Sequence, residues 1–407
     1  MPHKIIKRLI FFLTVFDLIM ILLLANGIDA SFFQKRSKIS SNALLASAEN
    51  HSTSFSPYTH AKVQLTRQQL MNAQGRGIKS VLLSPDKSKI YSLNLEGLSV
   101  YEYDRKSRKL NRELRFKPTQ GKGYNYQTRQ WYSSMQEKPV EGCFSHDGKY
   151  LWVSLHNAGG IVAWNLHMVE KQIKQPIKEG YVVYSDQTRQ LTQLKFIETG
   201  TTPKYISLAP EGDRLFVSNW HSNTISVIDI SSDDPNDWKK IKDLKTKAVP
   251  RGIVASPSAK KLFSTNMASN SIMVRDMETY AVDTILTGYR QPRHLLEDEY
   301  YLYATLSSAE KLIKINKESL ELSASCQTAD DPRTIAFSED KSLIFCTCYG
   351  DNKLEIYRAY DLEKVGEVKS YGGPVGVATY QEDNHVEVWV CNYKYASISI
   401  FDFDIVY

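Results

Sequence analysis

Residues 202–229 have the sequence TPKYISLAPEGDRLFVSNWHSNTISVID. Their apolar residues gather in three short runs, which end at Leu208, Val217 and Ile228. Pro-Glu-Gly-Asp and His-Ser-Asn separate the runs, and these are residues that tight turns favour. Short apolar runs bounded by turn residues predict three β-strands in this stretch.

The same pattern occurs seven times along the chain. A degenerate first copy begins at Ile78, and the others begin at Pro139, Pro203, Pro250, Pro292, Pro332 and Pro374. The last four intervals between copies are 47, 42, 40 and 42 residues, and a shorter fourth apolar segment follows the third in most copies. Four short strands per repeat of this length are typical of a β-propeller blade. We therefore expect an all-β, seven-bladed propeller of four-stranded blades.

The repeat resembles the YVTN repeat of seven-bladed β-propellers of the exported bacterial and archaeal type. Phe216-Val217-Ser218-Asn219 followed by residues 224–229 matches best, and residues 262–266 and 389–392 match well. Repeats one, two and five depart from the pattern. The resemblance covers about residues 78–402 and implies the fold. It implies little about function, because repeat residues of this kind are structural.

The third strand of repeat seven, Ser397–Phe401, is followed by no fourth strand of the usual kind. An incomplete blade would leave an exposed sheet edge, which proteins avoid. Residues 60–66, HAKVQLT, alternate as a strand does. We predict that they pair with Ser397–Phe401, complete the last blade and close the ring.

The N-terminus has the features of an export signal. Lys4, Lys7 and Arg8 precede an apolar run at residues 9–25, which Asp17 interrupts. We interpret residues 1–30 as a cleaved signal peptide or an N-terminal membrane anchor. Residues 31–57 are rich in Ser and Asn and are predicted to form a tether, and residues 58–407 a single propeller with insertions at about 105–138 and 167–190. The predicted location is the periplasm or cell surface, with residues 9–25 as a tether to the inner membrane if uncleaved.

The composition is that of a folded protein: 42% hydrophobic and 24% charged residues exclude a disordered or multi-span membrane chain. The five cysteines have neither zinc nor haem spacing and are expected to be mainly small buried thiols. One disulfide bond between two of them is the alternative.

A propeller turns each position of the repeat into a ring of side chains around its axis. At the second position of the inner strands, five of the seven residues are basic; in chain order the residues are Lys79, Val140, Lys204, Arg251, Arg293, Arg333 and Val375. We expect the basic residues to cluster at one mouth of the central channel and attract anions. Alternatively, Pro-Arg belongs to the turn chemistry of the repeat, with the guanidinium groups capping carbonyls of the next blade.

Loops between second and third strands should open on the same face. Their candidate ligand-binding residues are His156, Trp220, His221, Tyr349 and Tyr393. Aromatic residues over a basic mouth suit a planar or anionic ligand. His156 and His221 lack a third ligand nearby in the repeat pattern, so no metal site is predicted.

The first insertion, residues 105–138, contains ten Lys and Arg residues against Glu113 and Glu137. Its net charge of +8 exceeds the +6 of the whole chain, so the remainder is slightly acidic. Aromatic residues interleave with this charge, as in binders of polyanions or single strands. The alternative is an outer strand, Leu110–Phe116, with a solvated basic face and a lid packed by its own rings.

No sequence motif for a nucleophile, phosphate loop or metal centre is present, and no cofactor is predicted. Glu141 and His294 are acid and base candidates at the mouth, but they lie three blades apart. The preferred hypothesis is a monomeric, non-catalytic exported propeller that binds a protein, an envelope polymer or an anionic ligand. A lactonase-like hydrolase and a polyanion binder, nucleic acid included, remain alternatives.

Overall fold

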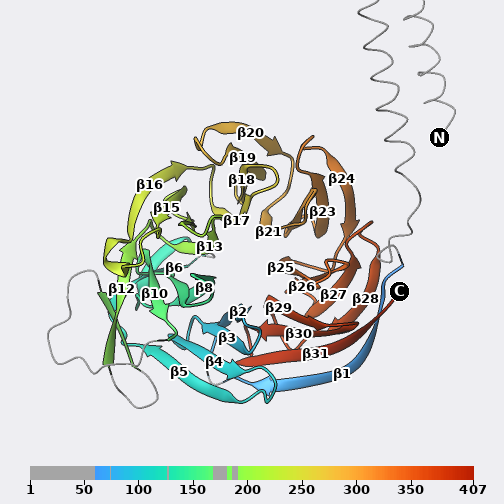
Figure 1. Ribbon diagram of the computed structural model, residues 1–407, viewed down its shortest axis with the longest axis horizontal. Coiled ribbons are helices and arrows are strands. Elements are labelled where there is room, and N and C mark those ends of the chain that lie inside the picture. Colours follow the sequence, from blue (N-terminus) through green and yellow to red (C-terminus); the bar gives the residue numbers. More distant parts are fainter. Residues whose placement is uncertain (1–59, 74, 126–127, 168–180, 186–190) are drawn as a thin grey trace, which may run out of the picture. The chain divides into compact units, whose positions relative to one another are not determined.

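The computed structural model describes residues 60–407 except 74, 126–127, 168–180 and 186–190. The predicted leader and tether lie outside these residues. In the described part, seven blades surround a central axis, which confirms the predicted seven-bladed propeller (Figure 1). No described helix is long and apolar enough to span a bilayer.

Five blades are built from four strands that follow one another in the chain. Each runs outward from an inner strand to an outer one in chain order. Blade one comprises β2 (Ile78–Leu83), β3 (Lys89–Asn94), β4 (Ser99–Asp104) and β5 (Leu110–Phe116). Blade three comprises β13 (Pro203–Leu208), β14 (Arg214–Asn219), β15 (Thr224–Asp229) and β16 (Lys239–Lys245), with a short 3-10 helix at Pro235–Asp237. Blade four comprises β17 (Pro250–Ser256), β18 (Lys261–Asn266), β19 (Ser271–Asp276) and β20 (Val282–Thr287). Blade five comprises β21 (Pro292–Glu297), β22 (Tyr301–Leu306), β23 (Lys311–Asn316) and β24 (Leu322–Gln327). Blade six comprises β25 (Pro332–Phe337), β26 (Leu343–Cys348), β27 (Lys353–Arg358) and β28 (Lys364–Lys369).

The core lies between the blades. Trp152 and Ile161 of blade two pack with Leu215 and Val217 of blade three, and all four are fully buried. Phe216, on the opposite face of the same strand, packs against blade four. Neighbours therefore bury both faces of a blade, which explains why its middle strands are apolar at successive positions.

The second insertion modifies blade two. Its strands are β8 (Pro139–Ser145), β9 (Tyr150–Leu155), β10 (Gly160–Asn165), β12 (Leu191–Glu198) and an additional outer strand, β11 (Tyr181–Ser185). β11 pairs with β12 and also with β5 of blade one, at Tyr184–Phe116 and Ser185–Arg115. Blades one and two are consequently joined at their outer edges into one sheet.

The first insertion forms the predicted outer strand, β5, and a separate hairpin of β6 (Gln120–Asn125) and β7 (Gln130–Met135). In this hairpin Gly123 faces Tyr132, whose ring lies where a side chain at position 123 would be.

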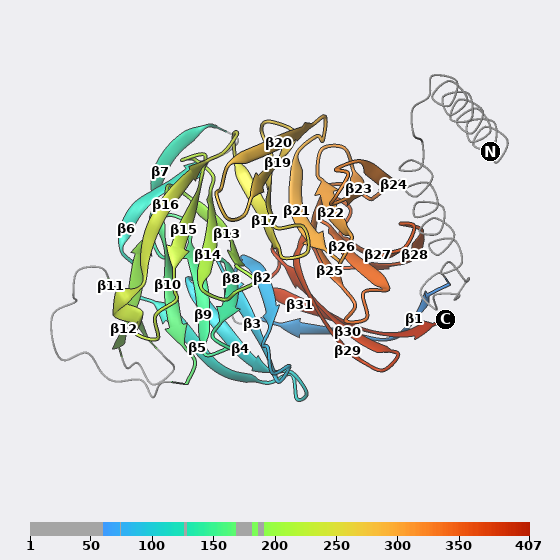
Figure 2. The ribbon, with the colours of Figure 1, turned by 45° about the horizontal axis from the view of Figure 1, so that its top comes forward.

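Blade seven closes the ring with a strand from each end of the described chain. It comprises β29 (Pro374–Glu382), β30 (His385–Asn392), β31 (Ser397–Val406) and the outer strand β1 (Lys62–Asn72), which runs alongside β31 (Figures 1 and 2). The closure is as predicted but the register differs. Residues 62–65 pair with Phe403–Val406, and residues 68–72 are the ones that pair with Ser397–Phe401. The reason is that β31 extends to Val406 and β1 follows its whole length.

Charged groups reinforce this closure. Arg108 of blade one donates from Nη2 to Glu387 and Asp402 of blade seven, each at 3.2 Å. The Arg105 guanidinium stacks 3.5 Å from the centre of the Tyr380 ring. Glu387 and Asp402 are both more than nine-tenths buried, so the pairs between blades one and seven are shielded from solvent and salt.

Candidate functional site

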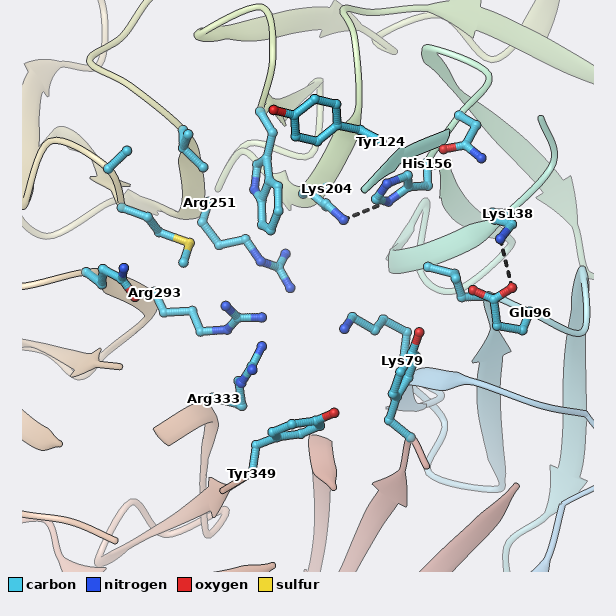
Figure 3. A pocket seen from close by; sticks show the side chains of 18 of the residues that line it. Lys79, Glu96, Tyr124, Lys138, His156, Lys204, Arg251, Arg293, Arg333 and Tyr349 are labelled. Atoms are coloured by element: carbon cyan, nitrogen blue, oxygen red, sulfur yellow. Dashed lines mark hydrogen bonds and ion pairs between the residues drawn. The ribbon is translucent and has the colours of Figure 1, made fainter. Parts of the chain in front are cut away.

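A cavity of about 550 Å³ opens at one mouth of the central channel, and its lining includes all five basic residues of the predicted ring (Figure 3). These residues occupy the second position of β2, β13, β17, β21 and β25. The remaining two blades place Val140 and Val375 at this position, and both are buried. The structure thus brings together the cations that the repeat aligned.

Hydroxyl groups of neighbouring blades fix the backbone at these positions. Ser154 Oγ donates to the carbonyl of Lys204 at 2.7 Å, and Ser218 Oγ donates to that of Arg251 at 2.8 Å. The same contact recurs from Thr265 to Arg293, from Thr305 to Arg333 and from Thr347 to Val375. The hydroxyl of each of these five blades therefore sets where the next blade presents its side chain to the channel.

The guanidinium groups of Arg251, Arg293 and Arg333 point toward one another and toward Lys79 (Figure 3). Arg251 donates from Nη2 to Glu141 at 2.6 Å, and Arg333 pairs with Asp331. Arg251 Nε and Nη1 and Arg333 Nε are buried without a hydrogen-bond partner among the described residues. These contacts do not match the alternative in which the guanidinium groups cap backbone carbonyls.

The cations destabilise one another. Burial, followed by Arg333 and Arg251, lowers the pKa of Arg293, and a guanidinium does not give up its proton in proteins. Burial, followed by the three arginines, lowers the pKa of Lys79 to about 7. Burial and Lys79 hold the pKa of Lys204 well below its usual range. An anion in the cavity would relieve this repulsion.

Lys204 and His156 form one unit. Lys204 Nζ lies 2.7 Å from His156 Nδ1, an acceptor when the imidazole is neutral. Burial and the Lys204 charge hold the pKa of His156 well below its usual range, consistent with the neutral ring.

Aromatic rings cover the basic side chains. Lys204 lies 4.2 Å from the Trp220 ring centre, Lys79 lies 4.6 Å from that of Tyr393, and Arg333 lies 4.5 Å from that of Tyr349. All three aromatic residues, which were candidates from the loop pattern, line the cavity together with His156.

His221, the remaining candidate, is not among the lining residues. Its ring packs 4.6 Å from Tyr124 and 5.3 Å from Trp131, both on the β6–β7 hairpin. Tyr124 and Tyr132 of that hairpin line the cavity. His221 therefore contacts the hairpin that carries part of the wall, and the insertion lies over the mouth as the lid interpretation required.

The ring pattern did not select several lining residues. Lys138, which ends the basic insertion, is buried and donates to Glu96 at 2.8 Å. Leu95, Val249 and Met267 add apolar surface. The aromatic pattern of the insertion could have identified Tyr124 and Tyr132, whereas nothing in the repeat distinguishes Glu96.

The acid and base candidates, Glu141 and His294, make contacts with other residues. Glu141 pairs with Arg251, and His294 packs 5.4 Å from the Tyr205 ring. Burial and the neighbouring arginines lower the pKa of His294 to about 3. Across the described residues, no group of three or more His, Cys, Asp or Glu is placed to hold a metal ion. All five cysteines are unbridged, and burial raises the pKa of Cys143 to about 12.

Comparison with known proteins establishes the fold alone. No family model and no curated protein matches the chain. Among solved structures 1305 chains match, which shows how widespread this architecture is. One is a chain of hydrazine synthase from Kuenenia stuttgartiensis, with 16% identity and a TM-score of 0.60 over 81% of this chain and 96% of that one. At that identity the function must be argued from the site.

Proposed function

We propose that this chain is an exported propeller of the YVTN-repeat type that binds a multiply charged, ring-bearing anion in its central mouth. The buried, unpaired N–H groups of Arg251 and Arg333 are the observation that carries the proposal. Each of these N–H groups is closed off from solvent in the empty cavity, so an acceptor around which the side chains closed would supply its missing hydrogen bond.

Charge supports an anion of more than one unit. Six basic residues line the cavity, and when all six are protonated the three acids that line it or pair with it leave an excess of three positive charges. The acids are Glu96, Glu141 and Asp331. A dianion or trianion would balance this excess.

Volume and aromatic surface define the rest of the ligand. About 550 Å³ is within the range of roughly 300–1,000 Å³ found for small-molecule sites. Trp220, Tyr349 and Tyr393 provide flat apolar faces beside the cations. A free molecule with a ring fits, and so does the terminal unit of an envelope polymer, because the two present the same chemistry to the site.

The alternatives draw less support from the site. A hydrolase that used the acid and base candidates of the sequence would need both groups free, but Glu141 is committed to Arg251 and His294 to a buried contact. A nucleic-acid strand would need an open platform, whereas Tyr124 packs on His221 and contributes to a cavity wall.

Calorimetric titration of the purified chain at low ionic strength tests the proposal. Citrate and a nucleoside monophosphate should bind, with affinity falling as salt rises. A variant with both Arg293→Met and Arg333→Met should lose binding at least tenfold. The control is Arg290→Met, an exposed arginine three residues before Arg293. The proposal fails if the wild-type chain binds neither anion, or if the double variant binds both unchanged. Tighter binding of a single-stranded oligonucleotide with a steep salt dependence would favour the polyanion alternative.

A further inference from the structure

The amine of Lys79 differs from the other lysine amines of the cavity. Lys138 pairs with Glu96, and Lys204 donates to His156. Within the described residues, no carboxylate lies within 4 Å of Lys79 Nζ, which lies beside the Tyr393 ring. The side chain points into the open cavity toward the three guanidinium groups (Figure 3). It is thus a primary amine placed where a ligand would lie.

Burial and the surrounding charges favour the neutral, nucleophilic form of this amine. Arg251 on β17, Arg293 on β21 and Arg333 on β25 face it, and Glu141 on β8 opposes their effect. With the pKa of Lys79 lowered to about 7, roughly half of the molecules carry a free amine at neutral pH. An ordinary lysine is in that form in about one molecule in three thousand. Lysines next to other cations gain reactivity in this way.

We propose that Lys79 is a nucleophile that captures a carbonyl-bearing anion of the 2-oxo acid class as a reversible imine. The inference rests on the proposed function, because the arginines that bind anions would hold the carboxylate. In a 2-oxo acid the carbonyl carbon is directly bonded to the carboxylate carbon. A carboxylate on the arginines therefore presents that carbonyl toward the amine opposite.

The step balances without a further reagent. The lone pair of Nζ attacks the carbonyl carbon, and a C–N bond forms while the carbonyl π bond breaks. The oxygen takes one proton from the amine and one from solvent and leaves as water. The product is a protonated imine with one N–H. The Tyr393 ring, already beside the amine, favours its positive charge. Hydrolysis returns the ligand and the free lysine.

Reductive trapping of the full chain tests the inference. The protein is incubated with pyruvate and cyanoborohydride at pH 7, and the modified peptides are mapped by mass spectrometry. Lys79 should be alkylated at least tenfold faster than exposed Lys117, and sulfate should protect it by occupying the arginines. Lys79→Arg, which keeps the charge without the nucleophile, should abolish this adduct, whereas Lys117→Arg should leave it unchanged. Thermal unfolding of each variant verifies that it is folded.

Two further results define the class of ligand and separate this inference from the one it rests on. Acetone, which has the carbonyl without the carboxylate, should label Lys79 at least tenfold more slowly than pyruvate; equal rates overturn the assignment to 2-oxo acids. If calorimetry detects sulfate binding but Lys79 reacts no faster than Lys117, the imine is refuted and the anion site stands. If sulfate, citrate and nucleotide all fail to bind, the anion site itself is refuted.

Discussion

Replacing Arg293 by methionine should make the empty protein more stable while weakening the proposed anion binding. The Arg293 side chain is 6% exposed, has no carboxylate within 4 Å among the described residues, and lies beside the charges of Arg251 and Arg333. Methionine has a similar length without the charge. Exchange of buried charges for apolar groups of similar volume often stabilises by about 1–4 kcal/mol. We expect about 1–3 kcal/mol, which for a propeller of this size is a rise in Tm of about 1.5–4 °C.

The assay is thermal unfolding in a zwitterionic buffer of low ionic strength, with and without sulfate. Sulfate should raise the Tm of the wild-type protein, because at a hundred times its Kd a ligand adds about 2.7 kcal/mol. The Arg293→Met variant should have a higher Tm without sulfate, and sulfate should raise its Tm by less. The exposed control Arg290→Met should change stability by no more than about 0.5 kcal/mol. The reasoning is refuted if Arg293→Met lowers the Tm in the absence of anions and still responds fully to sulfate.

Three other results are expected. Sulfate keeps its charge between pH 6 and 8.5, whereas Lys79 loses its ammonium charge as the pH passes its pKa of about 7. The affinity for sulfate, measured by calorimetry, should therefore be highest below pH 7 and fall roughly tenfold above it. The fall should be shallower in Lys79→Arg. Asp402→Ala should destabilise the ring by about 1–3 kcal/mol in urea unfolding, because it breaks a buried pair across the closure, whereas its exposed neighbour Asp404→Ala should cost less than about 0.5 kcal/mol. Gly372→Ala should lower the free energy of unfolding by about 2 kcal/mol or more, since the φ of Gly372 is +94° and the new Cβ would fall 2.2 Å from the Tyr395 ring. Gly212→Ala, with φ +75° and open space around the new Cβ, should lower it by about 1 kcal/mol. Equal losses of stability would contradict the packing argument.

Repetition made both the fold and most of the candidate site predictable. One well-formed copy, residues 202–229, allowed weaker copies to be recognised by position, even where the turn proline of repeat two is replaced by His146. Seven-fold placement then converted a column of residues into a ring, so Arg251, Arg293 and Arg333 could be grouped without coordinates. That inference depends on the symmetry of the ring, which follows directly from the repeat in the sequence.

Features that break the symmetry were not predictable in the same way. The register of β1 depends on how far β31 continues, and an alternating strand fits several registers equally well. The pairing of Glu141 with Arg251 and of Glu96 with Lys138, which leaves Lys79 without an acid, depends on distances across the channel. The position of His221 beneath the hairpin depends on where an insertion folds back, and its residues alone do not record this.

The pairing of β1 with β31 also bears on how the protein is made. Asn72 and its partner Ser397 are separated by 325 residues. At about 5–20 residues per second, β1 leaves the ribosome on the order of 20–60 seconds before its partner does. Polar residues predominate in its sequence, KVQLTRQQLMN, so it can wait in water with little tendency to join a foreign sheet. In a chain that ends before β31, both β1 and the outer edge of β30 would lack a partner strand. Limited proteolysis should cut such a chain faster than the closed ring.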